Sequence, residues 1–132
     1  MSELAPGQAL PELKVTPDKY LTYRYAGASG DFNPIHIDEE FAQSVGLPGR
    51  ILHGLWMMAQ VARSVSAAGD GPDALRSLSI QFRGMGFPEQ ELTVTASVKD
   101  VADGVASIQT EAEQDGRKII RKGEAEVRVA AS

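Results

Sequence analysis

Residues 54–68, GLWMMAQVARSVSAA, decide the fold. Their apolar side chains recur at helical spacing, and two neighbours widen the stripe: Leu55, Met58, Ala59, Ala62 and Val65, with Met57 and Val61. A helix that is apolar on nearly all sides is typical of a protein interior. We therefore predict a long central helix that the rest of the chain covers.

The sequence after this helix alternates apolar and polar residues with the period of a β-strand. Residues 78–83 and 92–99 both alternate in this way. Asp103-Gly104 and Asp115-Gly116 are tight-turn sequences that lead into two more strands. In the last strand we expect one face to be buried (Ala125, Val127, Val129) and the other exposed (Glu124, Glu126, Arg128). This half predicts an antiparallel meander.

The sequence before the central helix predicts shorter elements. A strand is expected around Ala9–Val15, and Thr16-Pro17-Asp18 has the composition of a helix start whose helix ends at Gly27–Gly30. Asp38-Glu39-Glu40 opens another helix, which Gly46 stops. Helices thus precede strands, which indicates an α+β fold with an antiparallel sheet curled around the long helix. Such a sheet has open edges, and a symmetric dimer would cover one of them.

Length and composition exclude several classes of protein. A chain of 132 residues, 42% of them hydrophobic, is expected to form a single domain over 1–132. The absence of Cys excludes disulfides, thiolate nucleophiles, Cys zinc sites and iron–sulfur clusters. The net charge of −5 disfavours nucleic-acid and anionic-membrane partners. We see no targeting segment and no apolar run of about 20 residues, so a cytoplasmic location is expected.

The densest polar chemistry lies in residues 27–36, GASGDFNPIH. Asp31, Asn33 and His36 fall within six positions, and Pro34 restricts the backbone between them. A carboxylate and an imidazole that share one water are the requirement for general acid–base addition or removal of water, and Asn33 could orient either group. The same stretch is also typical of a plain turn in which Asp and Asn cap backbone amides.

His53 and Gly54 stand where the central helix begins. Unpaired amides at a helix N-terminus stabilise a developing oxyanion, and glycine lets a ligand approach the backbone closely, so the Gly54 N–H is a candidate oxyanion donor. The alternative is that Gly54 only permits tight packing. For His53, the second of two histidines, we expect a structural hydrogen bond rather than catalysis.

The run Tyr25–His36, YAGASGDFNPIH, is similar to the signature of MaoC-like dehydratases and (R)-specific enoyl-CoA hydratases, and His53-Gly54 also lies where that family has it. The resemblance covers almost the whole chain in the order of its elements. It implies the hot-dog fold, in which a sheet wraps a long helix, and pairing of two protomers into one larger sheet. A cytoplasmic homodimer active in fatty acid metabolism is the resulting expectation.

The resemblance also implies an activity, the reversible hydration of a trans-2-enoyl thioester to the (R)-3-hydroxyacyl thioester. Asp31 would activate water, His36 would bind that water and pass a proton to or from the carbon next to the carbonyl, and Asn33 would support both. Gly54 N–H would hydrogen-bond the thioester oxygen. No metal or redox cofactor is implied, because the acyl carrier, coenzyme A or acyl carrier protein, is part of the substrate.

Two features concern the substrate. Many relatives have a Pro-x-x-Pro-Gly-Asp-like turn where this chain has Arg83–Gln90, a difference that bears on substrate range. Trp56 lies next to the implied acyl channel, where it would limit acyl length or branching unless it is only a core aromatic. Arg50 and Arg83 are candidate contacts for carrier phosphates, although isolated arginines are more often solvated or ion-paired.

Three other functions would use some of the same residues. His36, Asp38 and His53 have the residue types of a two-His-one-carboxylate iron site, but the Pro-locked turn and the helix caps argue against it. A non-catalytic hot-dog subunit that binds acyl groups or completes a heterodimer would usually lack the Asp/His motif. A hot-dog thioesterase would use the same helix N-terminus with a carboxylate, whereas the complete Asp31–His36 run favours hydration.

Overall fold

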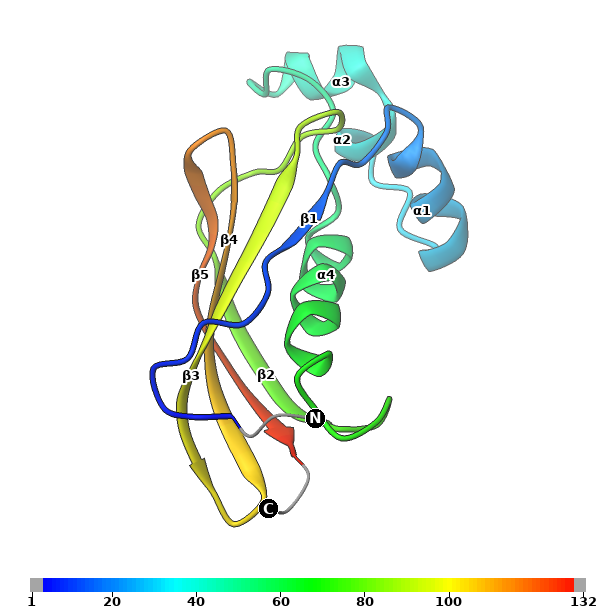
Figure 1. The fold of residues 1–132 in the computed structure, drawn as a ribbon. Coiled ribbons are helices and arrows are strands. Elements are labelled where there is room, and N and C mark those ends of the chain that lie inside the picture. The colour runs from blue at the N-terminus through cyan, green and yellow to red at the C-terminus, as the bar shows by residue number, and fades with distance from the viewer. Residues whose placement is uncertain (1–3, 130–132) are drawn as a thin grey trace.

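The computed structural model describes residues 4–129 as one curved antiparallel sheet lying over one long helix (Figure 1). The strands follow the order β1-β3-β4-β5-β2 across the sheet. The helices are α1 (Leu21–Ser29), α2 (Pro34–Ile37), α3 (Glu39–Ser44) and α4 (Gly54–Ser66), and the strands are β1 (Leu13–Val15), β2 (Leu75–Phe82), β3 (Leu92–Ala102), β4 (Val105–Gln114) and β5 (Arg117–Arg128). This confirms the α+β class. Among the described residues, no helix combines the length and the apolar character needed to cross a membrane.

Two local turns build the centre of the sheet. Asp103 and Gly104 join β3 to β4 with φ values of 54° and 76°, and Asp115 and Gly116 join β4 to β5 with φ values of 48° and 74°. Positive φ at both positions gives the turn a twist that matches the flanking strands. Both predicted hairpins are confirmed.

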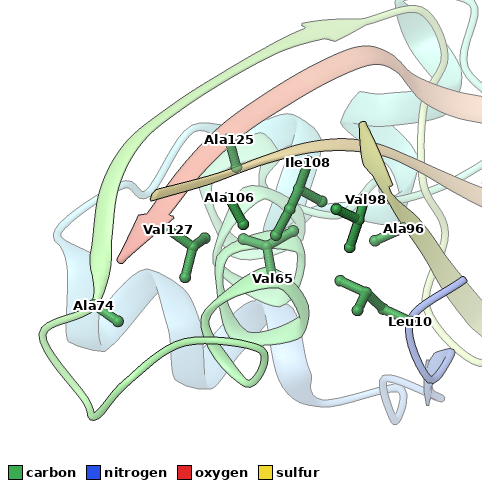
Figure 2. Close-up of a cluster of buried hydrophobic side chains, with 9 residues drawn as sticks. All are labelled: Leu10, Val65, Ala74, Ala96, Val98, Ala106, Ile108, Ala125 and Val127. Carbon is green, nitrogen blue, oxygen red and sulfur yellow. The ribbon is translucent and has the colours of Figure 1, made fainter. Parts of the chain in front are cut away.

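The core lies between the inner face of the sheet and α4. Every second residue of β3 from Leu92 to Val98 is buried, as the alternation predicted. Ala125 and Val127 of β5 point inward as expected, with Val129 half-buried. Figure 2 shows Val65 of α4 directed at the strands, opposite Ala106 and Ile108.

Only one face of α4 is buried, so the prediction of a helix covered on nearly all sides is wrong. The buried positions are Trp56, Met57, Gln60, Val61, Ser64 and Val65. Leu55 of the predicted stripe is 67% exposed and Ala59 is also exposed. A single sheet covers a single helix face, and the apolar residues on the far side of α4 meet no other layer of the described chain.

The N-terminal elements differ from their predicted bounds. The helix α1 begins at Leu21, because Pro17 O accepts a hydrogen bond from Glu89 N (2.6 Å) and Asp18 Oδ1 accepts one from Tyr20 N (2.8 Å). These bonds hold residues 17–20 in a turn. The predicted strand at Ala9–Val15 is reduced to β1 and an isolated bridge between Ala9 and Ser97. The predicted ends at Gly30 and Gly46 are confirmed by positive φ values of 78° and 92° just after α1 and α3.

Candidate functional site

The loop after α1 is built from short side-chain-to-backbone bonds. Asp31 Oδ1 accepts from Asn33 N (3.2 Å), and Asn33 Oδ1 accepts from Ile35 N (3.2 Å), which caps α2 with Pro34 at its first position. The turn interpretation of this sequence is therefore confirmed. A turn here is compatible with a functional role for the same residues. The bond to Asn33 N uses only Oδ1 of Asp31, so Oδ2 remains available, and His36 lies within the capped helix α2.

His36 is buried, and its hydrogen bond defines its tautomer. Nδ1 lies 2.8 Å from Ile51 O. Because a carbonyl oxygen only accepts, Nδ1 carries a proton, and in the neutral form of the ring Nε2 therefore has the lone pair. That Nε2 lies 3.8 Å from Asp31 Oδ2, beyond direct hydrogen-bonding distance. The Asp31 side chain is 53% exposed and the His36 side chain 9%, so the pair lies at the edge of the interior.

His53 joins this pair to the start of α4. It is the N-terminal capping residue of the helix, its ring is buried, and its Nε2 lies 3.0 Å from Asp31 O. Its ring stacks on His36 with centroids 3.9 Å apart, while Tyr25 packs on it at 4.8 Å. Burial lowers the pKa of His53, so the ring is held neutral as an N–H donor to the Asp31 backbone. His53 therefore makes the structural hydrogen bond that we expected. Its partner, Asp31 O, is 22 residues away and was not predicted.

Gly54 is the first residue of α4, directly after His53. The first N–H groups of a helix have no partner within it, so the Gly54 amide is of the kind that binds an anionic oxygen. A Cβ at this position would lie 3.2 Å from Cζ of Phe82, so the ring of Phe82 closes over the glycine. Since His53 bonds Asp31, the helix N-terminus and the Asp31–His36 pair belong to one site.

The substrate-related residues have separate locations. Trp56 is 8% exposed and packs in a core cluster with Leu52 and Met57, while its effect on acyl length stays a prediction. Arg83 is exposed and donates to Gln81. The Arg83–Gln90 loop is held by the buried side chain of Gln114, which bonds Phe87 N (2.8 Å), Phe87 O (3.0 Å) and Gln90 O (3.0 Å).

Within the described part of the chain, the residues grouped closely enough to hold a metal ion are Asp31, His36 and His53, and Asp38 is not among them. Ligand atoms of Asp31, His36 and His53 lie within 4.8 Å of one another. Asp38, the carboxylate of the rival iron site, instead caps α3 by accepting from Phe41 N (3.1 Å), as expected from the sequence. One ring nitrogen of each histidine is bonded to a backbone carbonyl, Ile51 O for His36 and Asp31 O for His53, so each ring has one remaining nitrogen.

Comparison with known proteins places this chain in a family. The family described as "MaoC like domain" matches residues 5–120. The chain is 36% identical over 107 residues to the fatty acid synthase beta subunit TOXC of Cochliobolus carbonum, an alignment that spans 78% of this chain and 5% of that protein. It is also 36% identical over 113 residues to the enoyl-CoA hydratase ChsH3 of Mycobacterium tuberculosis, which spans 81% of this chain and 38% of that protein. The chain thus corresponds to a small part of these relatives.

A solved structure shows the same fold. The (R)-hydratase from A. caviae involved in PHA biosynthesis superposes with a TM-score of 0.86 at 23% sequence identity, over 98% of this chain and 100% of that one. The predicted hot-dog fold is confirmed by this likeness, which extends to both the sheet and the helix that it wraps.

Proposed function

We propose that the chain is an (R)-specific enoyl-thioester hydratase, which in the reverse direction is a 3-hydroxyacyl-thioester dehydratase. The chain belongs to the MaoC-like hydratase and dehydratase family. The observation that carries this proposal is the pairing of Asp31 Oδ2 with His36 Nε2 at 3.8 Å. Two acceptor atoms at this separation can both hydrogen-bond one water. Through His53 the pair is tied to the helix N-terminus at Gly54.

The proposed reaction adds the hydroxyl group and one proton of a single water molecule across the double bond. Water oxygen bonds to the β-carbon of the enoyl thioester as one water proton passes to Asp31. The same proton is then delivered by way of His36 Nε2 to the α-carbon, so both residues return to their starting protonation states. Negative charge develops on the thioester oxygen during this step, and the Gly54 N–H stabilises it. Asn33 supports the pair by capping α2. Loss of water from the 3-hydroxyacyl thioester is the reverse of these steps.

The substrate follows from this chemistry as an acyl thioester of coenzyme A or acyl carrier protein. Hydration leaves the overall oxidation level unchanged, so the proposed reaction needs neither a redox cofactor nor a metal. The carrier is part of the substrate, and Trp56 is the residue proposed to limit acyl length.

The proposed assembly is a homodimer. Leu55 is 67% exposed on the uncovered face of α4, and Phe82 on β2 is 47% exposed. The strand β2 ends the sheet order and pairs only with β5 among the described strands, which leaves an edge that a second copy can extend. Light scattering is expected to give twice the mass of one chain.

A spectroscopic assay tests the proposed activity. Incubation with a short enoyl-CoA is expected to remove the absorbance of the conjugated enoyl group without releasing free thiol, and the reverse reaction is expected to consume only the (R)-3-hydroxyacyl isomer. Release of thiol without hydration would show a thioesterase, and no reaction on either carrier at any acyl length would favour an acyl-binding subunit. Metal analysis of the purified protein tests the alternative iron or zinc site.

A further inference from the structure

Arg50 is held inside the molecule by three parts of the chain. Its side chain is 12% exposed and donates from Nε to Glu39 Oε2 (3.2 Å), from Nη1 to Thr22 Oγ1 (2.7 Å) and from Nη2 to Lys19 O (3.0 Å). The guanidinium also lies 4.7 Å from the ring centroid of Tyr23. Each nitrogen of the guanidinium therefore has a partner within the chain, which argues against the role of a carrier-phosphate contact.

The Arg50 backbone is fixed by the same carboxylate. Its N–H donates to Glu39 Oε1 (3.3 Å), so Glu39 binds both the main chain and the side chain of Arg50. Gly49 allows this arrangement, because a Cβ at that position would collide with Oε1 of Glu39. The main chain at residues 49–50 is thus anchored to α3 through Glu39 and to α1 through Thr22.

The next residue is the one that sets the His36 tautomer. Ile51 N donates to Ile35 O (3.1 Å), and Ile51 O accepts from His36 Nδ1 (2.8 Å). A shift of the Ile51 carbonyl would remove the acceptor that keeps the proton on Nδ1. The Nε2 atom would then be protonated in a fraction of molecules and could no longer accept a hydrogen bond from water.

We propose that Arg50, together with Glu39, is a positioning residue that fixes the Ile51 carbonyl and thereby keeps His36 Nε2 free to take part in acid–base chemistry. This inference rests on the proposed function only for its kinetic readout, because the tautomer of His36 can be measured without a substrate. It assigns to the Arg50–Glu39 ion pair, in which the arginine side chain is 12% exposed and the carboxylate 52%, a role in the geometry of the site that is separate from any contact with substrate.

The test combines kinetics with nitrogen NMR of the imidazole rings. In Arg50→Met, which keeps an unbranched apolar stem but loses all three donors, we expect kcat to fall by about 10- to 100-fold, since small displacements of a catalytic group cost about this much. Glu39→Gln is expected to lose less, because its amide oxygen can still accept one bond. The Nδ1–H form of His36 is expected to dominate in the wild type and to become a mixture of tautomers in Arg50→Met.

The choice of substrate separates positioning from carrier recognition. The fall in kcat is expected to be equal for crotonyl-CoA and for crotonyl-N-acetylcysteamine, which has no phosphate. A rise in KM confined to the CoA thioester, or an unchanged His36 tautomer, would overturn the inference. If the wild type hydrates neither compound, the proposed function fails while the tautomer measurement still decides the role of Arg50.

Two further variants control for folding. Arg24→Met removes an exposed ion pair from α1, the helix that Arg50 contacts through Thr22, and is expected to change neither kcat nor the His36 tautomer. Arg50→Lys preserves the charge and most of the packing, but one ammonium group does not reproduce the planar three-way contact. If Arg50→Met does not fold, Arg50→Lys is expected to fold and to show the same mixture of His36 tautomers. A wild-type tautomer in folded Arg50→Lys would contradict the inference.

Discussion

The central sheet and the loop site are held together by different forces. In β3, β4 and β5, most of the buried side chains are apolar and form the core beside α4, and Figure 2 shows one cluster of them. In the site, geometry depends on single hydrogen bonds, such as His36 to Ile51 and His53 to Asp31. Apolar burial is non-directional and tolerates changes of shape, whereas a hydrogen bond fixes the position of one atom. Substitutions in the sheet should therefore change stability, and those in the site should change activity.

The largest effect is expected when the acid–base pair is removed. Asp31→Asn or His36→Gln should lower kcat by about 10²- to 10⁴-fold, the usual contribution of general acid–base catalysis. Asp31→Asn should change the free energy of unfolding by less than about 1 kcal/mol, because the new amide oxygen can still accept from Asn33 N. Hydration kinetics and chemical denaturation measure the two quantities.

The matched control for this comparison is Ile108→Ala in the core. Ile108 is 2% exposed and packs in the cluster beneath β4. The substitution should cost about 2–5 kcal/mol of stability and leave kcat of the folded protein unchanged. Full activity in Asp31→Asn or His36→Gln would contradict both the proposed function and the contrast between the two regions.

Trp56 tests a residue that lies between the regions. Trp56→Ala should lower the free energy of unfolding by about 3–5 kcal/mol, because an aromatic side chain leaves the core. If the ring also limits the acyl channel, as we propose, the variant should hydrate longer or branched enoyl thioesters better relative to crotonyl-CoA. Activity across a series of acyl lengths measures this. An unchanged preference would assign Trp56 to the core alone.

Gly54 should separate activity from stability. In Gly54→Ala the new methyl group would occupy space at the oxyanion amide, and we expect kcat to fall about tenfold, or about 1.4 kcal/mol. The gain of about 0.5–1 kcal/mol for alanine over glycine in a helix should offset the close contact with Phe82. Hydration kinetics and thermal unfolding give the two values.

The control for Gly54→Ala is Gly27→Ala in α1. A Cβ at Gly27 meets no atom within 4 Å, so the same gain of about 0.5–1 kcal/mol should appear without a contact to offset it. Undiminished kcat in Gly54→Ala would argue against a substrate oxygen at this amide.

The smallest effect concerns pH. Burial lowers the pKa of His53 in the folded state, so the unfolded chain binds more protons once the pH falls below the ordinary histidine pKa of about 6.5. The contribution of the neutral His53 ring to the free energy of unfolding is complete above about pH 6.5. It declines as the pH falls toward the lowered pKa of His53 in the folded state. The melting temperature should therefore drop between pH 7 and pH 5.5 by more in the wild type than in His53→Gln. An equal drop in both proteins would contradict this assignment.

Much of the fold was predictable because its signals are local. The strands β3 to β5 follow from alternation and from two Asp-Gly turns, all within adjacent residues. The end of α1 at Gly30 was equally local. The start of α1 was mispredicted because a distant residue, Glu89, binds Pro17 O and holds the preceding turn. The candidate residues Asp31, Asn33 and His36 were found because their spacing is itself a local signal.

The amino-acid sequence alone determined the strand order along the chain, the capped loop at residues 30–37 and the residue types of the site. Only the tertiary structure decided which face of α4 is buried, since the apolar pattern wraps most of that helix and the sheet covers one side. It also decided three hydrogen bonds between distant residues: His36 to Ile51, His53 to Asp31 and Arg50 to Thr22, whose partners are 15, 22 and 28 residues apart respectively. Residues this far apart in the sequence leave no repeating pattern that would predict their contact. Only folding of the chain brings each donor to its acceptor.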